Sequence, residues 1–453
     1  MSSPRALCWH GSTHGPGVDE EPELRLVVAS SNFGGGVGVV AAGGAEGAAR
    51  VDELASFLAD PNGDGAVADS PRLGLVQEMT RLVEPPVDYP ATVRQRIGPE
   101  AESFYIVCNS TERYPWREKW GRRWDVEGIR HMEEGMATFG TGGASLSAPW
   151  LDHGERPVAV DARGLALDLP IVRFADGEDD RDGWLGERVP WAGDSRVVSF
   201  RPSFYQGNRD TDPRAATAHH VIATDGAEDV ELVVINVHLG TLRNENRGEA
   251  RASADDGVTR IVRERTPEAA LLRRMHTRVL GSFIARVYRE LALPVVIAGD
   301  FNAAPDAWEL ACLLEEAMLV PTFETTSCWR CGRPVSRPQP PKRYWTDPEN
   351  RSLLSEAPDE VSRLTGRDPV PISATEHCGN EGCEAPLFTH KTNFRLIDNV
   401  LYTNPAMAGS LGLRFVLALA DPPNDEGRTR GLLLRTSYSD HLPIFATFEG
   451  RRV

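Results

Sequence analysis

The sequence predicts a mixed α/β fold, and three observations on its 453 residues support that class. Short runs rich in Val, Ile and Leu, of strand length and ending in small or polar residues, recur along the chain. One long segment, Pro267–Leu291, repeats its apolar residues at the spacing of an amphipathic helix. The chain shows no internal repeat of about 20 to 50 residues, which argues against a solenoid or a propeller.

The individual elements follow from the same patterns. Residues 1–23 are rich in Gly, Pro, Ser and acidic residues, and we expect them to form a flexible N-terminal tail. The first core strand is expected at Leu24–Asn32, followed by a helix at Ala48–Leu58 and a strand at Leu73–Met79. The remaining strand-like runs are Glu231–Gly240, Leu293–Asn302, Phe394–Asn404 and Ser439–Gly450.

Composition and charge indicate a globular protein without a general attraction for nucleic acid. Hydrophobic residues make up 41% and charged residues 25% of the chain, which is ordinary for a protein with a substantial core. The net charge is −17, so a polyanion would need a local basic patch or metal ions in order to bind. No run approaches the ~20 apolar residues of a membrane span, and the first residues lack the apolar core of a secretory signal. We therefore expect a cytoplasmic protein.

Polar residues stand where several predicted strands end. Such groups are costly at the ends of apolar strands unless they are paired or bound to metal. Gathered at one edge of a sheet, they would build a site for a divalent cation and a phosphate. Taken singly, each is more simply a residue of a surface loop, and only their joint order points to a site. They are Asn32, Glu78, His238, Asp300, Asn302, Asp398, Asp440 and His441.

Six short motifs contain these residues. In chain order they are a strand ending in Asn32, QE at 77–78, NVHL at 236–239, GDFN at 299–302, LIDNVLY at 396–402 and SDH at 439–441. This series resembles the endonuclease/exonuclease/phosphatase superfamily of metal-dependent phosphoesterases, and the resemblance covers residues 24–450. It implies a deoxyribonuclease-like fold, a two-layered β-sandwich flanked by helices, with the motif-bearing loops gathered at one end.

The resemblance also implies a catalytic metal ion. Glu78 would be its main ligand, and Asn32 and Asp440 would lie near the ion. These are oxygen ligands, which suit Mg²⁺ or Mn²⁺.

Five further residues receive roles through the same resemblance. Asp300 would orient or deprotonate the attacking water, Asn302 would hold the phosphate, and His238 would donate to a non-bridging oxygen. Asp398 would bond to His441 and fix its tautomer, so that His441 could stabilise the transition state or act as an acid or base.

Residues 321–392 form a predicted insertion that is rich in proline and contains two short-spaced cysteine pairs. Four thiolates in two pairs can build a tetrahedral zinc site, which would be structural because all four ligand positions are taken. His377 could replace a cysteine of the second pair, and reduced thiols without metal are the alternative. The cysteines are Cys328, Cys331, Cys378 and Cys383.

One basic and aromatic segment, Thr111–Asp125, bears on the substrate. Its three tryptophans, Trp116, Trp120 and Trp124, are interleaved with arginines and could stack on nucleic-acid bases. The simpler interpretation is a helix that packs its tryptophans against the body of the protein.

Together these features predict a divalent-metal-dependent phosphoesterase, with a nuclease or phosphodiesterase acting on nucleic acid or a nucleotide as the first choice. A phosphomonoesterase acting on a small or lipid-derived phosphate would share the same residues. A catalytically silent module that binds a partner through the zinc insertion is the alternative from another class.

Overall fold

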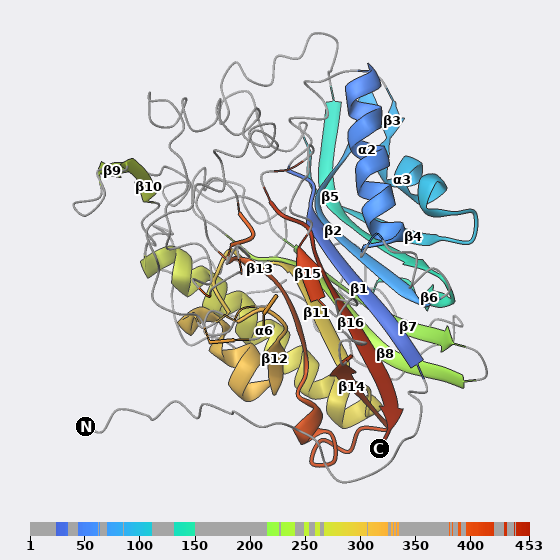
Figure 1. Ribbon diagram of the computed structural model, residues 1–453, viewed down its shortest axis with the longest axis vertical. Coiled ribbons are helices and arrows are strands. Elements are labelled where there is room, and N and C mark those ends of the chain that lie inside the picture. The colour runs from blue at the N-terminus through green and yellow to red at the C-terminus, as the bar shows by residue number, and fades with distance from the viewer. Residues whose placement is uncertain are drawn as a thin grey trace, which may run out of the picture.

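The protein is represented by a computed structural model in which two β-sheets pack face to face, with helices on their outer faces (Figure 1). The described residues are 24–34, 44–61, 63, 70–84, 86–110, 131–149, 215–225, 228–240, 249–252, 259–262, 267–305, 307–324, 328, 330–331, 333–334, 380, 383, 388–390, 396–420, 430–432, 439 and 441–453.

The first sheet has eight strands and the second has six. The order in the first sheet is β14 (Phe415–Leu419), β16 (Ile444–Arg452), β1 (Leu24–Asn32), β2 (Arg72–Glu84), β5 (His131–Thr141) and β4 (Glu102–Ser110), with β15 (Arg430–Leu432) on β16 and β3 (Val87–Asp88) on β2. The order in the second sheet is β12 (Leu319–Pro321), β13 (Asp398–Thr403), β11 (Val295–Asp300), β8 (Glu228–His238), β7 (Ala215–Asp225) and β6 (Ala144–Leu146). A separate two-stranded sheet consists of β9 (Glu249–Ala252) and β10 (Thr259–Val262).

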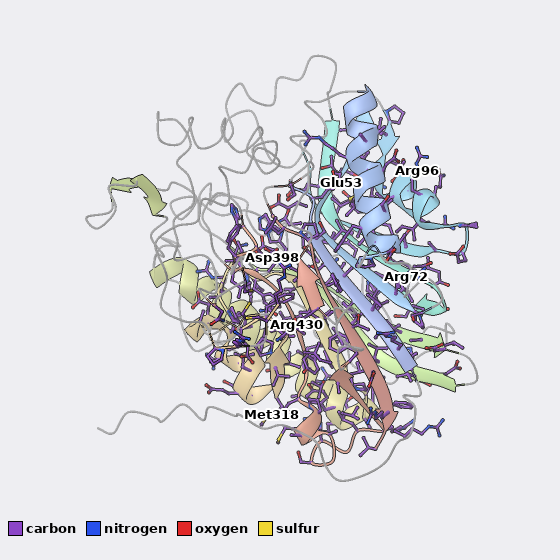
Figure 2. The ribbon with its side chains drawn as sticks, viewed as in Figure 1. Glu53, Arg72, Arg96, Met318, Asp398 and Arg430 are labelled. Atoms are coloured by element: carbon purple, nitrogen blue, oxygen red, sulfur yellow. The ribbon has the colours of Figure 1, made fainter. Side chains whose placement is uncertain are left out.

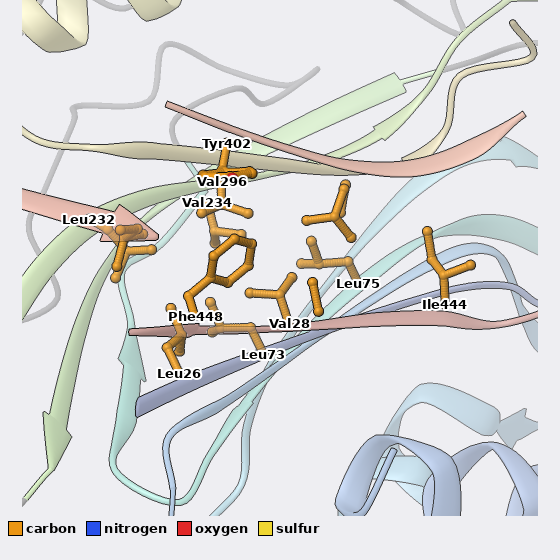
Figure 3. Close-up of a cluster of buried hydrophobic side chains, with 14 of the residues drawn as sticks. Leu26, Val28, Leu73, Leu75, Leu232, Val234, Val296, Tyr402, Ile444 and Phe448 are labelled. Atoms are coloured by element: carbon orange, nitrogen blue, oxygen red, sulfur yellow. The ribbon is translucent and has the colours of Figure 1, made fainter. Parts of the chain in front are cut away.

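Both faces of the central strands are buried, which explains why they read as nearly continuous apolar runs. In β8, Leu232 and Val234 pack into the core between the sheets, whereas Val233 and Ile235 pack into a second core on the outer face. Figure 3 shows the inter-sheet core, with side chains of the first sheet such as Leu26 facing those of the second.

Helices cover the outer faces of the two sheets. Helix α6 (Pro267–Leu291) places Leu280, Phe283 and Ile284 against the second sheet, at the spacing of one helix face. Helix α2 (Gly44–Ala59) packs on the first sheet beside α3 (Tyr89–Ile97). Short 3₁₀ turns at Trp308–Leu310 and Pro405–Met407 and a short π-helix at Cys312–Glu316 complete the described helices. Among the described helices, none combines the length and the apolar character needed to cross a bilayer.

The predicted two-layered sandwich with flanking helices is confirmed. The first strand and the long helix have the predicted bounds, whereas β2 continues past Met79 to Glu84 and α2 begins four residues before Ala48. Element ends are set by tertiary hydrogen bonds, which local periodicity does not report. The predicted tail, residues 1–23, and most of the predicted insertion lie outside the described residues.

A buried polar contact joins the two sheets. Gln77 of β2 donates from Nε2 to Oδ1 of Asn236 in β8, at 2.7 Å, and both side chains are fully buried. Asn236 in turn donates to the backbone oxygens of Val76 and Ala137, at 3.2 and 2.9 Å. One side chain of the second sheet therefore bonds to two strands of the first, and it satisfies carbonyl groups that would otherwise face an apolar core.

Replacing Asn236 by Leu should lower the free energy of unfolding by roughly 3 kcal/mol, because buried hydrogen-bonding groups lose their partners. Urea unfolding of Asn236→Ala, Gln77→Ala and the double variant should also give a coupling of at least about 0.5 kcal/mol. Strictly additive effects of the two single substitutions would contradict the contact.

His219 of β7 is a buried histidine that should make the protein sensitive to acid. Burial lowers its pKa to about 4, against a smaller opposing effect of the hydrogen bond between its Nδ1 and the Ser147 oxygen, at 2.9 Å. The ordinary pKa of histidine is 6.5, so between pH 6.5 and about pH 4 His219 binds more protons in the unfolded state than in the folded state. The contribution of His219 to the free energy of unfolding is therefore fully present above pH 6.5, and it is lost as the pH falls towards 4.

The His219→Gln variant should have a smaller loss of stability than the wild type on acidification from pH 7 to pH 4, by up to about 3 kcal/mol. The measurement is urea unfolding as a function of pH for both proteins. Parallel curves for the two proteins would show that His219 does not titrate in this range.

Candidate active site

The side chains that face the inter-sheet core change from apolar to polar at one end of the sandwich. Along β8, Leu232 and Val234 are followed two and four residues later by Asn236 and His238, and the same change occurs in neighbouring strands. The corresponding polar residues are Ser30 and Asn32 of β1, Gln77 of β2 and Asp300 of β11. Because β1 and β2 are parallel and β8 and β11 are parallel, these residues collect at matching strand ends.

The register of the second sheet places three of the predicted residues in one row. Asp300 pairs with His238 on one side and with Asp398 on the other. In the first sheet, Asn32 pairs with Gln77. The two rows meet where Nδ2 of Asn32 donates to Oδ2 of Asp300, at 3.2 Å.

Asp300 is the centre of the group. It is buried, and one of its oxygens accepts from the backbone N–H of Asn302 at 2.8 Å, while the other lies 3.3 Å from Nε2 of His238 and 3.8 Å from Nε2 of His441. Burial raises the pKa of Asp300, but the charge of His441, together with His238 and the Asn302 N–H, outweighs burial and holds the pKa well below its usual range. Asp300 is therefore a carboxylate at neutral pH.

His441 and Asp398 form a buried pair. Nδ1 of His441 lies 2.8 and 3.0 Å from the two oxygens of Asp398, whose position in the sandwich is marked in Figure 2. Burial raises the pKa of Asp398 and the nearby Asp300 charge raises it further, against the lowering effect of His441. A carboxylate at Asp398 accepts the Nδ1 proton, which fixes the ring so that Nε2 faces Asp300.

Three residues of the site have backbone conformations that are uncommon or that require glycine. Glu78 and Asn302 have φ values of 53° and 50°. Glu78 lies within a register shift of β2, between Val76 and Met79, and such a bulge can redirect a side chain that strand alternation would send to the other face. Gly299 has φ 150°, and a Cβ there would lie 1.9 Å from the Val237 oxygen.

Glu78 is the carboxylate of the group with the greatest exposure. Its side chain is 20% exposed, whereas those of Asp300 and Asp398 are 3% and 4% exposed. Its Oε1 lies 3.7 Å from Nε2 of His238. Asp300, Asp398 and His441 also lie within 4.8 Å of one another, but the Asp398 carboxylate and Nδ1 of His441 are engaged in their own hydrogen bond. Glu78 is therefore the better candidate for a metal ligand.

The structure thus brings together Asn32, Glu78, His238, Asp300, Asp398 and His441. Asn302 joins them through its backbone, and its Nδ2 donates to the Leu239 oxygen at 3.1 Å. Asp440, predicted near the ion, lies outside the described residues.

Thr389 and His390 support the buried pair and were not singled out from the sequence. Oγ1 of Thr389 accepts from the backbone N–H groups of Ile397 and Asp398, at 3.0 and 2.9 Å. The ring of His390 meets that of His441 nearly edge-on, with centroids 4.5 Å apart, and the two residues form an isolated β-bridge. No periodic pattern marks this contact between segments 51 residues apart in the sequence.

A buried ion pair behind the site also escaped the sequence analysis. Nε and Nη2 of Arg273 in α6 donate to Oε1 of Glu309, at 3.2 and 3.1 Å, and Nη1 donates to the Gly240 oxygen at 3.3 Å. The Gly240 N–H donates to Nδ1 of His276 at 3.3 Å. These contacts hold Gly240, two residues after the end of β8, and therefore the backbone next to His238.

The sulfur atoms of Cys328, Cys331 and Cys383 lie within 4.8 Å of one another. All three are free thiols, and Cys328 is fully buried. Cys378 and His377 lie outside the described residues.

Comparisons with known proteins find likeness in structure only. No family model and no curated protein matches the sequence. Among solved structures, the chain is similar to the catalytic domain of human Nocturnin, with 12% identity and a TM-score of 0.39 over 96% of this chain and 97% of that one. It is also similar to an endonuclease/exonuclease/phosphatase family protein from Bacteroides thetaiotaomicron, with 10% identity and a TM-score of 0.39 over 95% and 98%.

A third similar structure is the mannosyl-6-phosphatase Bt3783 of Bacteroides thetaiotaomicron, with 11% identity and a TM-score of 0.40 over 94% of this chain and 99% of that one. The matched structures include proteins described by the family name that the six motifs resemble. Since the identities and TM-scores are low, we infer function from the site itself.

Replacing Arg273 by Met should destabilise the protein by about 3–5 kcal/mol, because the Glu309 carboxylate would remain buried without its partner. The double variant Arg273→Met, Glu309→Gln should recover part of that loss. Urea unfolding of the wild type and the two variants measures both effects. A cost of the Arg273 substitution below about 1 kcal/mol, the range of an exposed pair, would rule out the structural role.

Proposed function

We propose that the protein is a divalent-metal-dependent phosphoric ester hydrolase, and that its substrate is a phosphodiester of nucleic acid or a nucleotide. The observation that carries the proposal is the Asp300 carboxylate, which lies between two histidine nitrogens and accepts from two further N–H groups, beside the more exposed Glu78. Such an arrangement can orient a water molecule and donate to a phosphate in the same place.

Glu78 and Asn32 would hold the metal ion. Both offer oxygen atoms, and Oδ1 of Asn32 accepts one hydrogen bond, from Gly34 N at 2.8 Å, which leaves a lone pair for a hard cation. This donor set suits Mg²⁺ or Mn²⁺. The bound ion would supply Lewis-acid chemistry by withdrawing charge from the phosphate and its leaving oxygen.

The chain's own residues would do the remaining work. Asp300 would orient the attacking water through a hydrogen bond, because its depressed pKa keeps it ionised. His238 and His441 would direct their Nε2 atoms at the phosphate, and the Asp398 carboxylate would hold the ring of His441 during that step. Asn302 would contact a phosphate oxygen.

The choice of a phosphodiester rests on one segment of the sequence. The basic and aromatic segment Thr111–Asp125 favours a nucleic acid, but it lies outside the described residues. The net charge of −17 favours a small substrate over a polyanion, so a phosphomonoester is the second candidate.

A panel of phosphate esters should identify the substrate class. Hydrolysis of single- and double-stranded DNA, RNA, nucleotides, inositol phosphates and a generic diester is measured with Mg²⁺, with Mn²⁺ and with EDTA. We expect turnover of one class that requires the metal and is absent in Glu78→Ala. Glu290→Ala removes a carboxylate on the outer helix α6 and should keep wild-type turnover.

On the substrate that is found, Asp300→Asn and His441→Ala should each lower kcat by roughly 10²-fold or more, since each removes a group acting in the transition state. Asp52→Asn makes the same chemical change as Asp300→Asn at a half-exposed position on α2 and should have no effect. Wild-type turnover in the Asp300 and His441 variants would refute the assigned roles. Tight metal-dependent binding without hydrolysis of any ester would point to a binding module.

A further inference from the structure

We propose that Cys328, Cys331 and Cys383 bind one structural zinc ion, and that this zinc site holds the segments that position the Asp398–His441 pair. Zinc binding itself does not depend on the proposed function, whereas its effect on turnover does.

The spacing of the sulfur atoms fits a tetrahedral ion. Sγ of Cys328 and Sγ of Cys383 lie 3.7 Å apart, and all three sulfurs lie within 4.8 Å of one another. Zinc–sulfur bonds of about 2.3 Å place the ligands of a tetrahedral site about 3.8 Å apart. A disulfide would need about 2.0 Å, and the three residues are free cysteines.

The first two cysteines lie in a turn whose backbone favours thiolates. The Arg330 N–H donates to Sγ of Cys328 at 3.4 Å, and the Cys328 N–H donates to the Arg333 oxygen at 2.9 Å. Nδ2 of Asn380 donates to Sγ of Cys331 at 3.3 Å. Donors aimed at sulfur stabilise the charged form that a metal requires.

The electrostatics of the cluster agree with this geometry. Arg430 of β15, labelled in Figure 2, interacts electrostatically with Cys328 and donates to the Thr322 oxygen. A guanidinium beside several thiolates balances the negative charge of a zinc–thiolate centre.

The proposed site consists of the three described cysteines. Cys378, which the sequence places five residues before Cys383, lies outside the described residues.

Two chain segments lead from the cysteines to the two sides of Asp398. On one side, five residues before Cys328, the backbone of Phe323 exchanges hydrogen bonds with the Asn399 side chain, at 3.3 and 2.8 Å. On the other side, six residues after Cys383, Oγ1 of Thr389 accepts from the Asp398 N–H at 2.9 Å.

The second segment continues directly to His441. The Thr389 oxygen accepts from the Leu442 N–H at 2.6 Å, and His390 packs edge-on against the ring of His441. Phe388 is fully buried in the core cluster that also contains Cys328. Zinc would therefore hold together two segments, distant in sequence, that both end at the buried pair, which makes Thr389 and His390 positioning residues.

Elemental analysis of the purified full-length protein tests the site without any substrate. We expect about one zinc per chain in the wild type, and well under half of that in Cys331→Ser and Cys383→Ser. Cys312→Ser is the matched control, because this buried cysteine lies outside the cluster and a hydroxyl can keep its hydrogen bond to Glu316.

A thiol titration of the native wild type keeps the test valid if the serine variants do not fold. A mercurial reagent should release the zinc as the clustered thiols react, and a metal indicator measures the released ion. Zinc well below one per chain, with every thiol freely reactive from the start, would overturn the proposal.

The link to the buried pair has its own readouts. The low-field proton resonance of His441 Nδ1, identified by its absence in His441→Ala, should broaden or shift when zinc is removed. An unchanged resonance in zinc-free protein would refute the link whether or not the protein is an enzyme.

Thr389→Ala should retain zinc but lower kcat roughly tenfold or more with little change in KM. A displaced Asp398–His441 pair slows the chemical step more than it weakens substrate binding. Thr389→Ser keeps the hydroxyl and should restore kcat. Equal kcat in Thr389→Ala and the wild type would show that the segment does not position the pair.

Discussion

The hydrogen bond between Gln77 and Asn236 joins the two sheets at the place where the apolar interior ends. Towards one end of the sandwich, the inward-facing side chains are those of a dry core. Towards the other end they are polar or charged, and these groups require hydrogen bonds when they are buried. The buried amide pair is the boundary between these regions, and it fixes how β2 and β8 lie relative to each other. The distance between Asn32, which pairs with Gln77, and Asp300, which pairs with His238, depends on that alignment.

Two of the four described non-glycine residues with positive φ lie beyond this boundary. Glu78 and Asn302 have positive φ, and Gly299 allows β11 to approach the Val237 oxygen more closely than any side chain would permit. Such conformations persist only where the surroundings hold them. Here hydrogen bonds hold Asn302: its backbone N–H donates to Asp300, and its side-chain Nδ2 donates to the Leu239 oxygen. Backbone strain and charge are thus placed together, and the closely packed sandwich stabilises both.

Polar contacts outside the six motifs support the candidate active-site residues from two sides. Behind β8, Arg273 is paired with Glu309 and donates to the oxygen of Gly240, two residues after His238. Beside β13, Thr389 holds the backbone of Asp398. Both supports are buried, and both connect segments far apart in sequence. They leave the central carboxylate, Asp300, with fixed neighbours on every strand that borders it.

The sequence by itself determined the α/β class and the strand ends that carry polar residues, and the resemblance of its six motifs to a known family implied the two-layered sandwich. Runs such as Leu24–Asn32 and Leu293–Asn302 reveal both an apolar strand and its polar end, because strand periodicity is local and short motifs preserve it. Tertiary structure alone decided the register that sets His238, Asp300 and Asp398 in one row, and the contacts made by Thr389, His390 and Arg273. These depend on which segments meet across gaps of tens of residues. Local periodicity does not reveal such contacts, because the pattern of a short segment is the same whichever distant segment packs against it.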